Sequence, residues 1–109
     1  MLAKKNRLPI STNTKHFLTF PAVFFSVKVG ENKINKTRFN FVVAKSIDKR
    51  ATVRNRLKRQ LRSFTEENYS KIKKGYDFLF KVKKEARGRE TKEIHNQIKQ
   101  VLKKEGLIE

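Results

Sequence analysis

Hydrophobic residues alternate with polar ones in three short stretches of this chain, and alternation is typical of strands with one buried face. The stretches are residues 23–29, 38–45 and 76–83, and each is rich in Val or Phe. The segment 30–37 between the first two is polar and begins with Gly30, so it predicts a hairpin loop. We therefore expect a small sheet whose first two strands are neighbours.

Two other stretches repeat their apolar residues every three or four positions, the spacing of an amphipathic helix. The first predicted helix runs from residue 49 or 50 to 68, and the second follows Gly88 and is stopped by Gly106. The apolar stripes are Val53, Leu57, Leu61 and Phe64 in the first helix and Ile94, Ile98, Val101 and Leu102 in the second. The order β-β-α-β-α predicts an α+β domain in which helices cover one face of the sheet.

The chain is strongly basic. Its 109 residues include 28 Lys and Arg but 10 Asp and Glu, a formal net charge of +18, whereas solubility alone favours a magnitude of about 2 to 8. Residues 1–62 carry 16 basic and 2 acidic side chains, so most of the excess lies there. Because such a charge repels itself unless a polyanion accepts it, we expect a nucleic-acid partner that is contacted mainly by these residues.

The sequence shows no repeat and no linker, so we expect a single RNA-binding domain over residues 1–109, with an irregular basic segment at 1–16. The absence of cysteine suits a reducing cytoplasm. The longest apolar stretch, 20–29, is too short to span a bilayer, and no apolar signal segment follows the first basic residues. We therefore expect a cytoplasmic protein with no membrane contact.

The first predicted helix is basic on both flanks of its apolar stripe, around the run Arg54-Asn55-Arg56. Seven basic residues and no acidic residue lie between positions 49 and 62, so contact with nucleic acid explains them better than a solvated surface does. Asn55 is a poor helix former in an interior position. Its presence there favours a functional role over a structural one.

Candidate catalytic groups are scarce. His16 and His95 have no partner at metal-ligand spacing, so both are expected at the surface. Asp48 and Asp77 are the only aspartates, and the glutamates are scattered mostly through the C-terminal third. No set of carboxylates indicates hydrolysis with two metal ions, which argues against a nuclease whose catalyst is protein.

The sheet face that the helices leave open is predicted to carry an aromatic ring among lysines. Strand alternation places six side chains there: Phe24, Ser26, Lys28, Leu79, Lys81 and Lys83. Bases can stack on a ring while amines hold the backbone, so this face suits single-stranded nucleic acid. The core is expected to contain Phe25, Phe39, Phe41, Phe64, Phe78 and Phe80.

Ala44-Lys45, Arg50-Ala51, the run Arg-Asn-Arg-Leu-Lys-Arg at 54–59 and the strand at 76–84 resemble the signature of the bacterial ribonuclease P protein subunit. The resemblance covers residues 38–104. It implies a small two-layer α+β sandwich, like domain 2 of ribosomal protein S5, with a left-handed β-α-β crossover. It also implies that a catalytic RNA, with Mg²⁺ bound mainly by that RNA, removes the 5′ leader of precursor tRNA. This chain would be the accessory subunit, one monomer for each catalytic RNA.

The resemblance assigns RNA contact to the basic helix and the residues before it: Lys45, Lys49, Arg50, Arg54, Asn55, Arg56, Lys58, Arg59 and Arg62. For a cleft that takes the leader, strand alternation adds Phe24, Lys28, Lys81 and Lys83. Family members usually carry an N-terminal helix with two Phe residues one turn apart, and Phe17 and Phe20 are expected to replace that pair. Ser46, where a second Lys is common, and Asp48 also depart from the family pattern.

Two other functions stay open at this point. A structural RNA-binding protein, such as a small ribosomal protein, has similar charge and size and would bind RNA without changing any cleavage rate. A protein-only nuclease would be active without added RNA and would depend on a carboxylate.

Overall fold

The computed structural model describes residues 18–109. Four strands and two helices follow one another along the chain: β1 (Leu18–Pro21), β2 (Phe25–Glu31), β3 (Arg38–Val42), α1 (Ala51–Glu67), β4 (Tyr76–Val82) and α2 (Thr91–Lys104). Short 3₁₀ turns follow α1 at Tyr69–Lys71 and precede α2 at Lys84–Ala86. The predicted helices and three predicted strands are therefore confirmed to within a few residues at each end.

The strands form one sheet in the order β1-β2-β4-β3. β2 pairs with β1 and β4 antiparallel, whereas β3 pairs with β4 parallel. The predicted hairpin between the strands at 23–29 and 38–45, which are β2 and β3, is wrong, because β4 lies between them. Phe80 shows why β4 takes the central position, since it lies opposite Val27 of β2 on one side and Phe41 of β3 on the other. A central strand needs apolar partners on both sides, and β4 finds them.

β1 was not predicted from the sequence. It has four residues and ends at Pro21, which lacks the backbone N–H that a central strand needs. Its partner is β2, with Phe20 opposite Val27. The strand lies at the edge of the sheet, where short strands and prolines are tolerated, and so short a segment carries too little alternation to be recognised.

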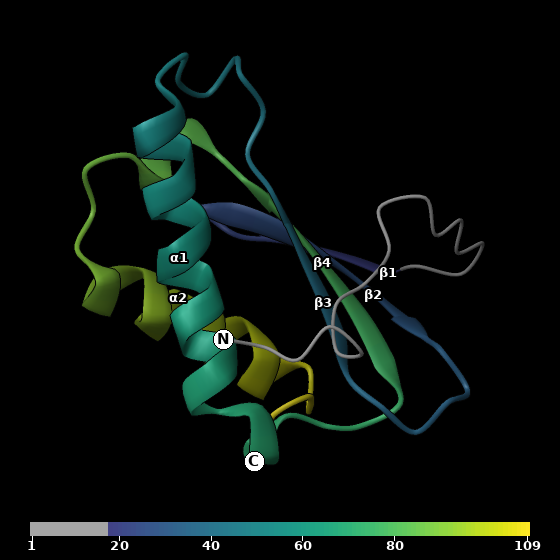
Figure 1. Ribbon diagram of the computed structural model, residues 1–109. Coiled ribbons are helices and arrows are strands. Elements are labelled where there is room, and N and C mark those ends of the chain that lie inside the picture. The colour runs from purple at the N-terminus through teal and green to yellow at the C-terminus, as the bar shows by residue number, and fades with distance from the viewer. Residues whose placement is uncertain (1–17) are drawn as a thin grey trace.

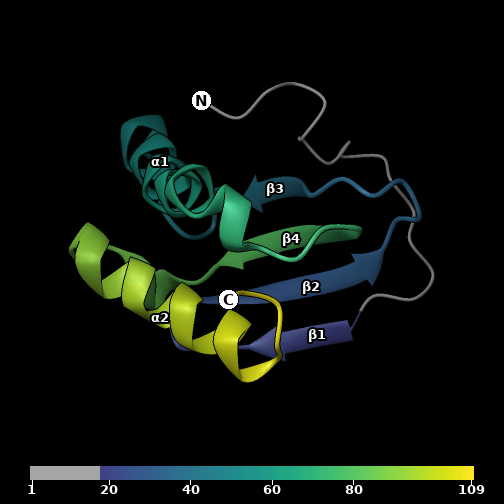
Figure 2. The same cartoon turned by 90° about the horizontal axis from the view of Figure 1, so that it is seen from below.

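α1 and α2 lie side by side on one face of the sheet (Figure 2). Figures 1 and 2 together show β3 nearer the viewer of Figure 1 than β4, with α1 to the left of both. The chain climbs β3, descends α1 and climbs β4, turning counterclockwise as it moves away from that viewer. The crossover is therefore left-handed, whereas about 98% of such connections are right-handed.

The core lies between the sheet and the two helices. Phe39 stacks on Phe78 with ring centroids 5.3 Å apart, and Phe41 stacks on Phe80 at 5.5 Å. The helices contribute the predicted stripes, of which the buried members are Leu57, Leu61, Phe64, Ile94, Ile98 and Leu102. Each buried side chain of this size stabilises the fold by about 1.5 to 3 kcal/mol. This packing holds α1 with its apolar side inward and its basic residues toward solvent.

Candidate nucleic-acid interface

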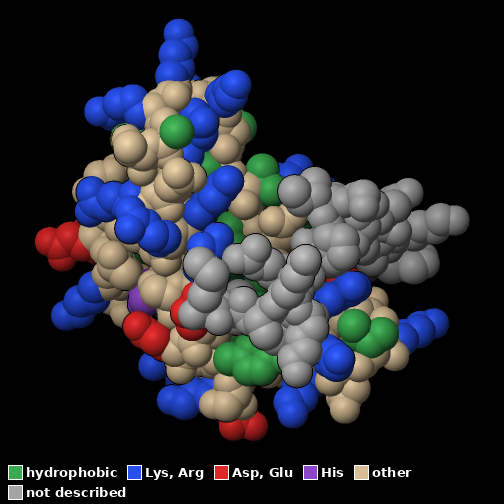
Figure 3. Space-filling view, in the orientation of Figure 1, with side chains coloured by type: hydrophobic (Ala, Val, Ile, Leu, Met, Phe, Trp, Pro, Cys, Tyr) green, Lys and Arg blue, Asp and Glu red, His purple; other side chains and the backbone are tan. Residues whose placement is uncertain are grey.

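The basic residues of α1 all lie between Arg54 and Arg62, on the sides of the helix that face away from the core. Figure 3 shows Lys and Arg side chains gathered over this helix. A shallow groove of about 400 Å³ runs along its outer side. The residues that line this outer groove are Thr52, Asn55, Lys58, Arg59 and Arg62. The fold thus brings together four of the residues that the sequence assigned to RNA, because they recur on one side of a regular helix.

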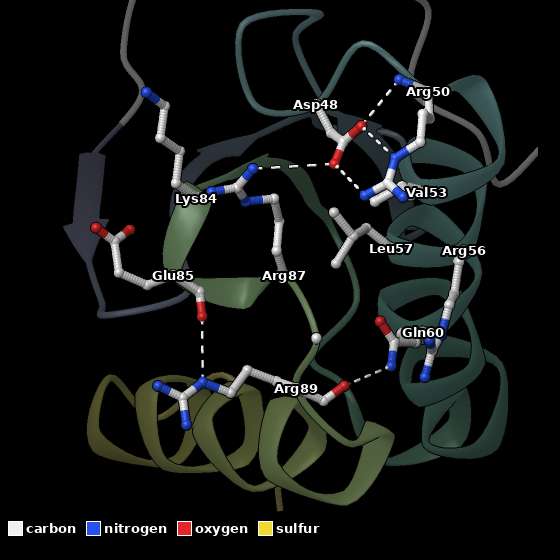
Figure 4. A pocket seen from close by; sticks show the side chains of 11 residues that line it. Asp48, Arg50, Val53, Arg56, Leu57, Gln60, Lys84, Glu85, Arg87 and Arg89 are labelled. Atoms are coloured by element: carbon white, nitrogen blue, oxygen red, sulfur yellow. Dashed lines mark hydrogen bonds and ion pairs between the residues drawn. The ribbon is translucent and has the colours of Figure 1, made fainter.

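A second concavity opens on the opposite flank of α1, between this helix and the segment that joins β4 to α2 (Figure 4). This inner pocket has a volume of about 720 Å³. Its lining residues are Asp48, Arg50, Val53, Arg56, Leu57, Gln60, Lys84, Glu85, Arg87, Gly88 and Arg89. Arg50 and Arg56 were predicted RNA contacts, whereas the basic residues of 84–89 were not. The run Lys-Lys-Glu-Ala-Arg-Gly-Arg at 83–89 was the available signal.

Asp48 accepts hydrogen bonds from the Arg50 guanidinium at one edge of the inner pocket. Nε of Arg50 lies 3.1 Å from Oδ1 of Asp48, and a terminal nitrogen lies 3.0 Å from Oδ2. The backbone N–H of Arg50 also donates to Oδ1, at 2.9 Å, and a terminal nitrogen of Arg87 is 3.9 Å from Oδ2. These contacts, led by the Arg50 guanidinium and then its backbone N–H, lower the pKa of the Asp48 carboxyl from 3.8 to about 2. Asp48 is therefore ionised at neutral pH.

Other predicted RNA contacts differ in how they are held. A terminal nitrogen of Arg54 donates to the carbonyl oxygens of Asp48 and Lys49, at 3.0 and 2.9 Å. The Arg62 guanidinium lies 5.9 Å from the centroid of the Phe41 ring. Lys45 and Lys49 are exposed just before α1. The basic surface thus continues from the helix onto the connection that precedes it.

The predicted leader-cleft residues are not gathered on one face. Lys28 and Lys81 alternate with the buried Val27 and Phe80, so they share the open face of the sheet. Phe20 lies opposite Val27 and packs against the core. Lys83 donates to the carbonyl oxygen of Ala22 at 2.7 Å. Phe17 lies outside the described residues.

The expectation that Phe24 stands beside Lys28 on the open face is wrong. Phe24 precedes β2, its ring packs partly against the core, and its backbone N–H donates to Oε1 of Gln97 in α2 at 2.7 Å. The Arg89 guanidinium lies 5.4 Å from the centroid of the same ring. Strand alternation does not apply to Phe24 because it lies before the first paired residue of β2.

His95 is half-buried between the helices rather than at the surface as predicted. Its Nε2 lies 2.8 Å from both Oγ of Ser63 and the carbonyl oxygen of Gln60.

Within residues 18–109, no three His, Cys, Asp or Glu side chains are close enough together to hold a metal ion. In the same range, no helix has the length and apolar character needed to cross a membrane.

This chain is similar in sequence and in fold to known proteins. Residues 10–106 match the family described as "Ribonuclease P". The "Ribonuclease P protein component" of Synechocystis sp. is 28% identical over 94% of this chain and 91% of its own length, and that of Clostridium kluyveri is 37% identical over 70% and 69%. The fold also matches the solved Staphylococcus aureus RNase P protein, with a TM-score of 0.77, 26% identity and coverage of 85% and 84%.

Proposed function

This chain belongs to the ribonuclease P protein family, and we propose that it binds the catalytic RNA of a bacterial ribonuclease P and assists removal of the 5′ leader from precursor tRNA. The family is that of the protein component of a tRNA-processing ribonucleoprotein. The observation that most strongly supports RNA binding is the basic helix α1. This helix presents cations on two opposite flanks while its apolar stripe is buried.

In this proposal α1 is the contact with the catalytic RNA. Asn55, Lys58, Arg59 and Arg62 hold backbone phosphates along the outer groove, and Arg50 and Arg56 reach RNA from the inner pocket. Contacts of this kind position the protein on the RNA without reading its sequence. Arg54 has a double role, because it also ties α1 to the preceding connection.

The chemistry is proposed to reside in the RNA. The donor set of residues 18–109, with no cluster of three possible ligands, does not fit a protein-borne magnesium site. Mg²⁺ is therefore assigned to RNA phosphates, which are oxygen ligands of the kind that this ion prefers. The protein then contributes binding and positioning, and its place of action is the cytoplasm.

The leader of the precursor is assigned to the open face of the sheet. Lys28 and Lys81 supply charge along this face, which fits a single strand held mainly through its phosphates. With Phe24 against Gln97 and Arg89 rather than on this face, stacking on its ring is not part of the proposal.

The test is cleavage of precursor tRNA by a bacterial ribonuclease P RNA at low Mg²⁺, with and without this protein. We expect the protein to restore cleavage, and to do so more strongly for precursors with a leader of several nucleotides. Tight binding of the RNA without any rescue would favour a structural RNA-binding protein instead. Cleavage by the protein without added RNA would favour a protein nuclease.

A matched pair of variants tests the assignment of α1. Arg56→Ala should flatten the plot of log affinity for the catalytic RNA against log salt by about one unit, because one phosphate contact is lost. Lys103→Ala removes the same charge from the exposed surface of α2 and should leave the slope unchanged. Equal slopes for both variants and the unmodified protein would contradict a phosphate contact at Arg56.

A further inference from the structure

The inner pocket has more cations than anions. Its lining contains Arg50, Arg56, Lys84, Arg87 and Arg89 against the two carboxylates Asp48 and Glu85. Asp48 is the carboxylate that arginines bind, through the guanidinium of Arg50 and more distantly that of Arg87. The lining of the inner pocket therefore keeps a net positive charge even though Asp48 is paired with arginine.

The exposure of these side chains is uneven. The Asp48 side chain is 8% exposed, whereas those of Arg50 and Arg87 are 74% and 48% exposed. The carboxylate is thus covered by its cations, while the cations remain open to solvent. A macromolecular anion that arrives from solution meets Arg50 and Arg87 before it meets Asp48.

Arg50 binds Asp48 in the geometry that a guanidinium also uses for phosphate. Nε and a terminal nitrogen donate side by side to the two carboxylate oxygens, and the same fork accepts two oxygens of a phosphodiester. Asp48 therefore occupies the donors that the RNA contact proposed for Arg50 would need. Because the same two N–H groups of Arg50 cannot bind Asp48 and a phosphate at once, the two anions compete.

We infer that Arg50 and Arg87 form a phosphate-binding position for RNA at the edge of the inner pocket, and that Asp48 is its intramolecular competitor, displaced when the RNA backbone binds. This inference rests on the proposed function for the identity of the RNA. The ligand group is a backbone phosphodiester, which either the catalytic RNA or the precursor tRNA can supply. Asp48 then lowers the affinity for RNA rather than supporting it.

If Asp48 had a purely structural role, removal of its charge would leave RNA binding unchanged or weaken it. Asp48 also accepts the backbone N–H of Arg50 at 2.9 Å, just before α1 begins, so it helps to shape this connection. Asp48→Asn separates the two roles, because an amide oxygen can still accept that N–H while the negative charge is removed. Circular dichroism would establish that the variant is folded.

The experiment measures binding of Asp48→Asn to the catalytic RNA, and of the assembled ribonucleoprotein to precursor tRNA, between about 50 and 200 mM salt. We expect affinity for one of the two RNAs to rise about 3- to 10-fold at the lower salt, since a like charge beside a bound phosphate is removed. The salt slope should steepen by up to about 0.9. The RNA that shows the change identifies the source of the phosphate.

Glu85→Gln is the matched control, because it removes one negative charge from the same pocket but frees no guanidinium bound through its carboxylate. Adding Arg87→Ala to Asp48→Asn should reverse part of the gain. Unchanged or weaker binding of Asp48→Asn to both RNAs would overturn the inference, as would an equal gain from Glu85→Gln.

A titration with inorganic phosphate keeps this inference separate from the proposed function. In NMR spectra, the chemical shifts of the side-chain Nε–H groups of Arg50 and Arg87 should change at a lower phosphate concentration in Asp48→Asn than in the unmodified protein. Equal responses would overturn the competition. If neither RNA binds the unmodified protein, the proposed function fails, and the phosphate titration alone decides the role of Asp48.

Discussion

At the scale of single residues, the run Arg54-Asn55-Arg56 divides into three different environments. Arg54 donates to carbonyl oxygens of the preceding connection, Asn55 lines the outer groove, and Arg56 lines the inner pocket. Consecutive helical positions are about 100° apart around the axis, so neighbours in sequence face different surfaces. The sequence predicts RNA contact for all three residues, but it does not show that they lie on separate sides of α1.

Asp48 provides a prediction for stability against pH. Its pKa is lowered to about 2 in the folded protein, so the ionised carboxylate stabilises the fold above its ordinary pKa of 3.8, and this contribution is lost as the pH falls toward 2. We expect urea unfolding to show a stability difference between the unmodified protein and Asp48→Asn that is constant near neutral pH and shrinks between pH 3.8 and about 2. A difference that does not change with acidification would contradict the ion pair with Arg50.

At the scale of elements, the two helices begin in different ways. α2 has a capping box, in which the Glu90 side chain accepts the backbone N–H of Glu93 and the Glu93 side chain accepts that of Glu90. The N-cap residue of α1 is Arg50, whose side chain makes no capping hydrogen bond, and the first turn of this helix has no acidic residue. The start of α1 lacks a capping box, so this helix depends more on the packing of Leu57, Leu61 and Phe64.

The capping box predicts the effect of Glu90→Ala. The free energy of unfolding should fall by about 1 kcal/mol, because the backbone N–H of Glu93 loses its side-chain acceptor and keeps only the carbonyl oxygen of residue 90, 3.0 Å away. Lys92→Ala, at an exposed position of the same helix, should change it by less than about 0.5 kcal/mol. Denaturant unfolding measures both, and equal losses in the two variants would show that the box contributes nothing specific.

At the scale of the whole molecule, the net charge of +18 destabilises the folded chain through self-repulsion. A multivalent anion that binds the folded state should therefore raise the melting temperature. At about 100 times its dissociation constant, such a ligand stabilises by about 2.7 kcal/mol, which corresponds to several degrees for a domain of this size.

Tripolyphosphate at constant ionic strength is the suitable probe, with melting followed by circular dichroism. Spermine, a polycation, serves as the control and should leave the melting temperature unchanged, because it has no complementary surface on so basic a protein. Equal shifts with both compounds, or none with tripolyphosphate, would show that charge repulsion does not limit stability.

Local order could be read from the sequence. The two helices, their buried stripes, the basic flanks of α1, the stop at Gly106 and three of the four strands follow from spacing between near neighbours, since helical and strand periodicities are properties of consecutive residues. The resemblance to a family also rested on short motifs within these elements. These features are the ones that the fold confirms.

Tertiary structure alone decided which distant segments meet. The sheet order, the left-handed crossover, the place of Phe24 and the pairing of Asp48 with Arg87 all join parts of the chain that are far apart in sequence. Their outcome depends on how the whole set of apolar faces is buried at once, because β4 gains partners on both edges only when it separates β2 from β3. Periodicity carries no information on that choice, so the inner pocket and its competing carboxylate became visible only in the folded chain.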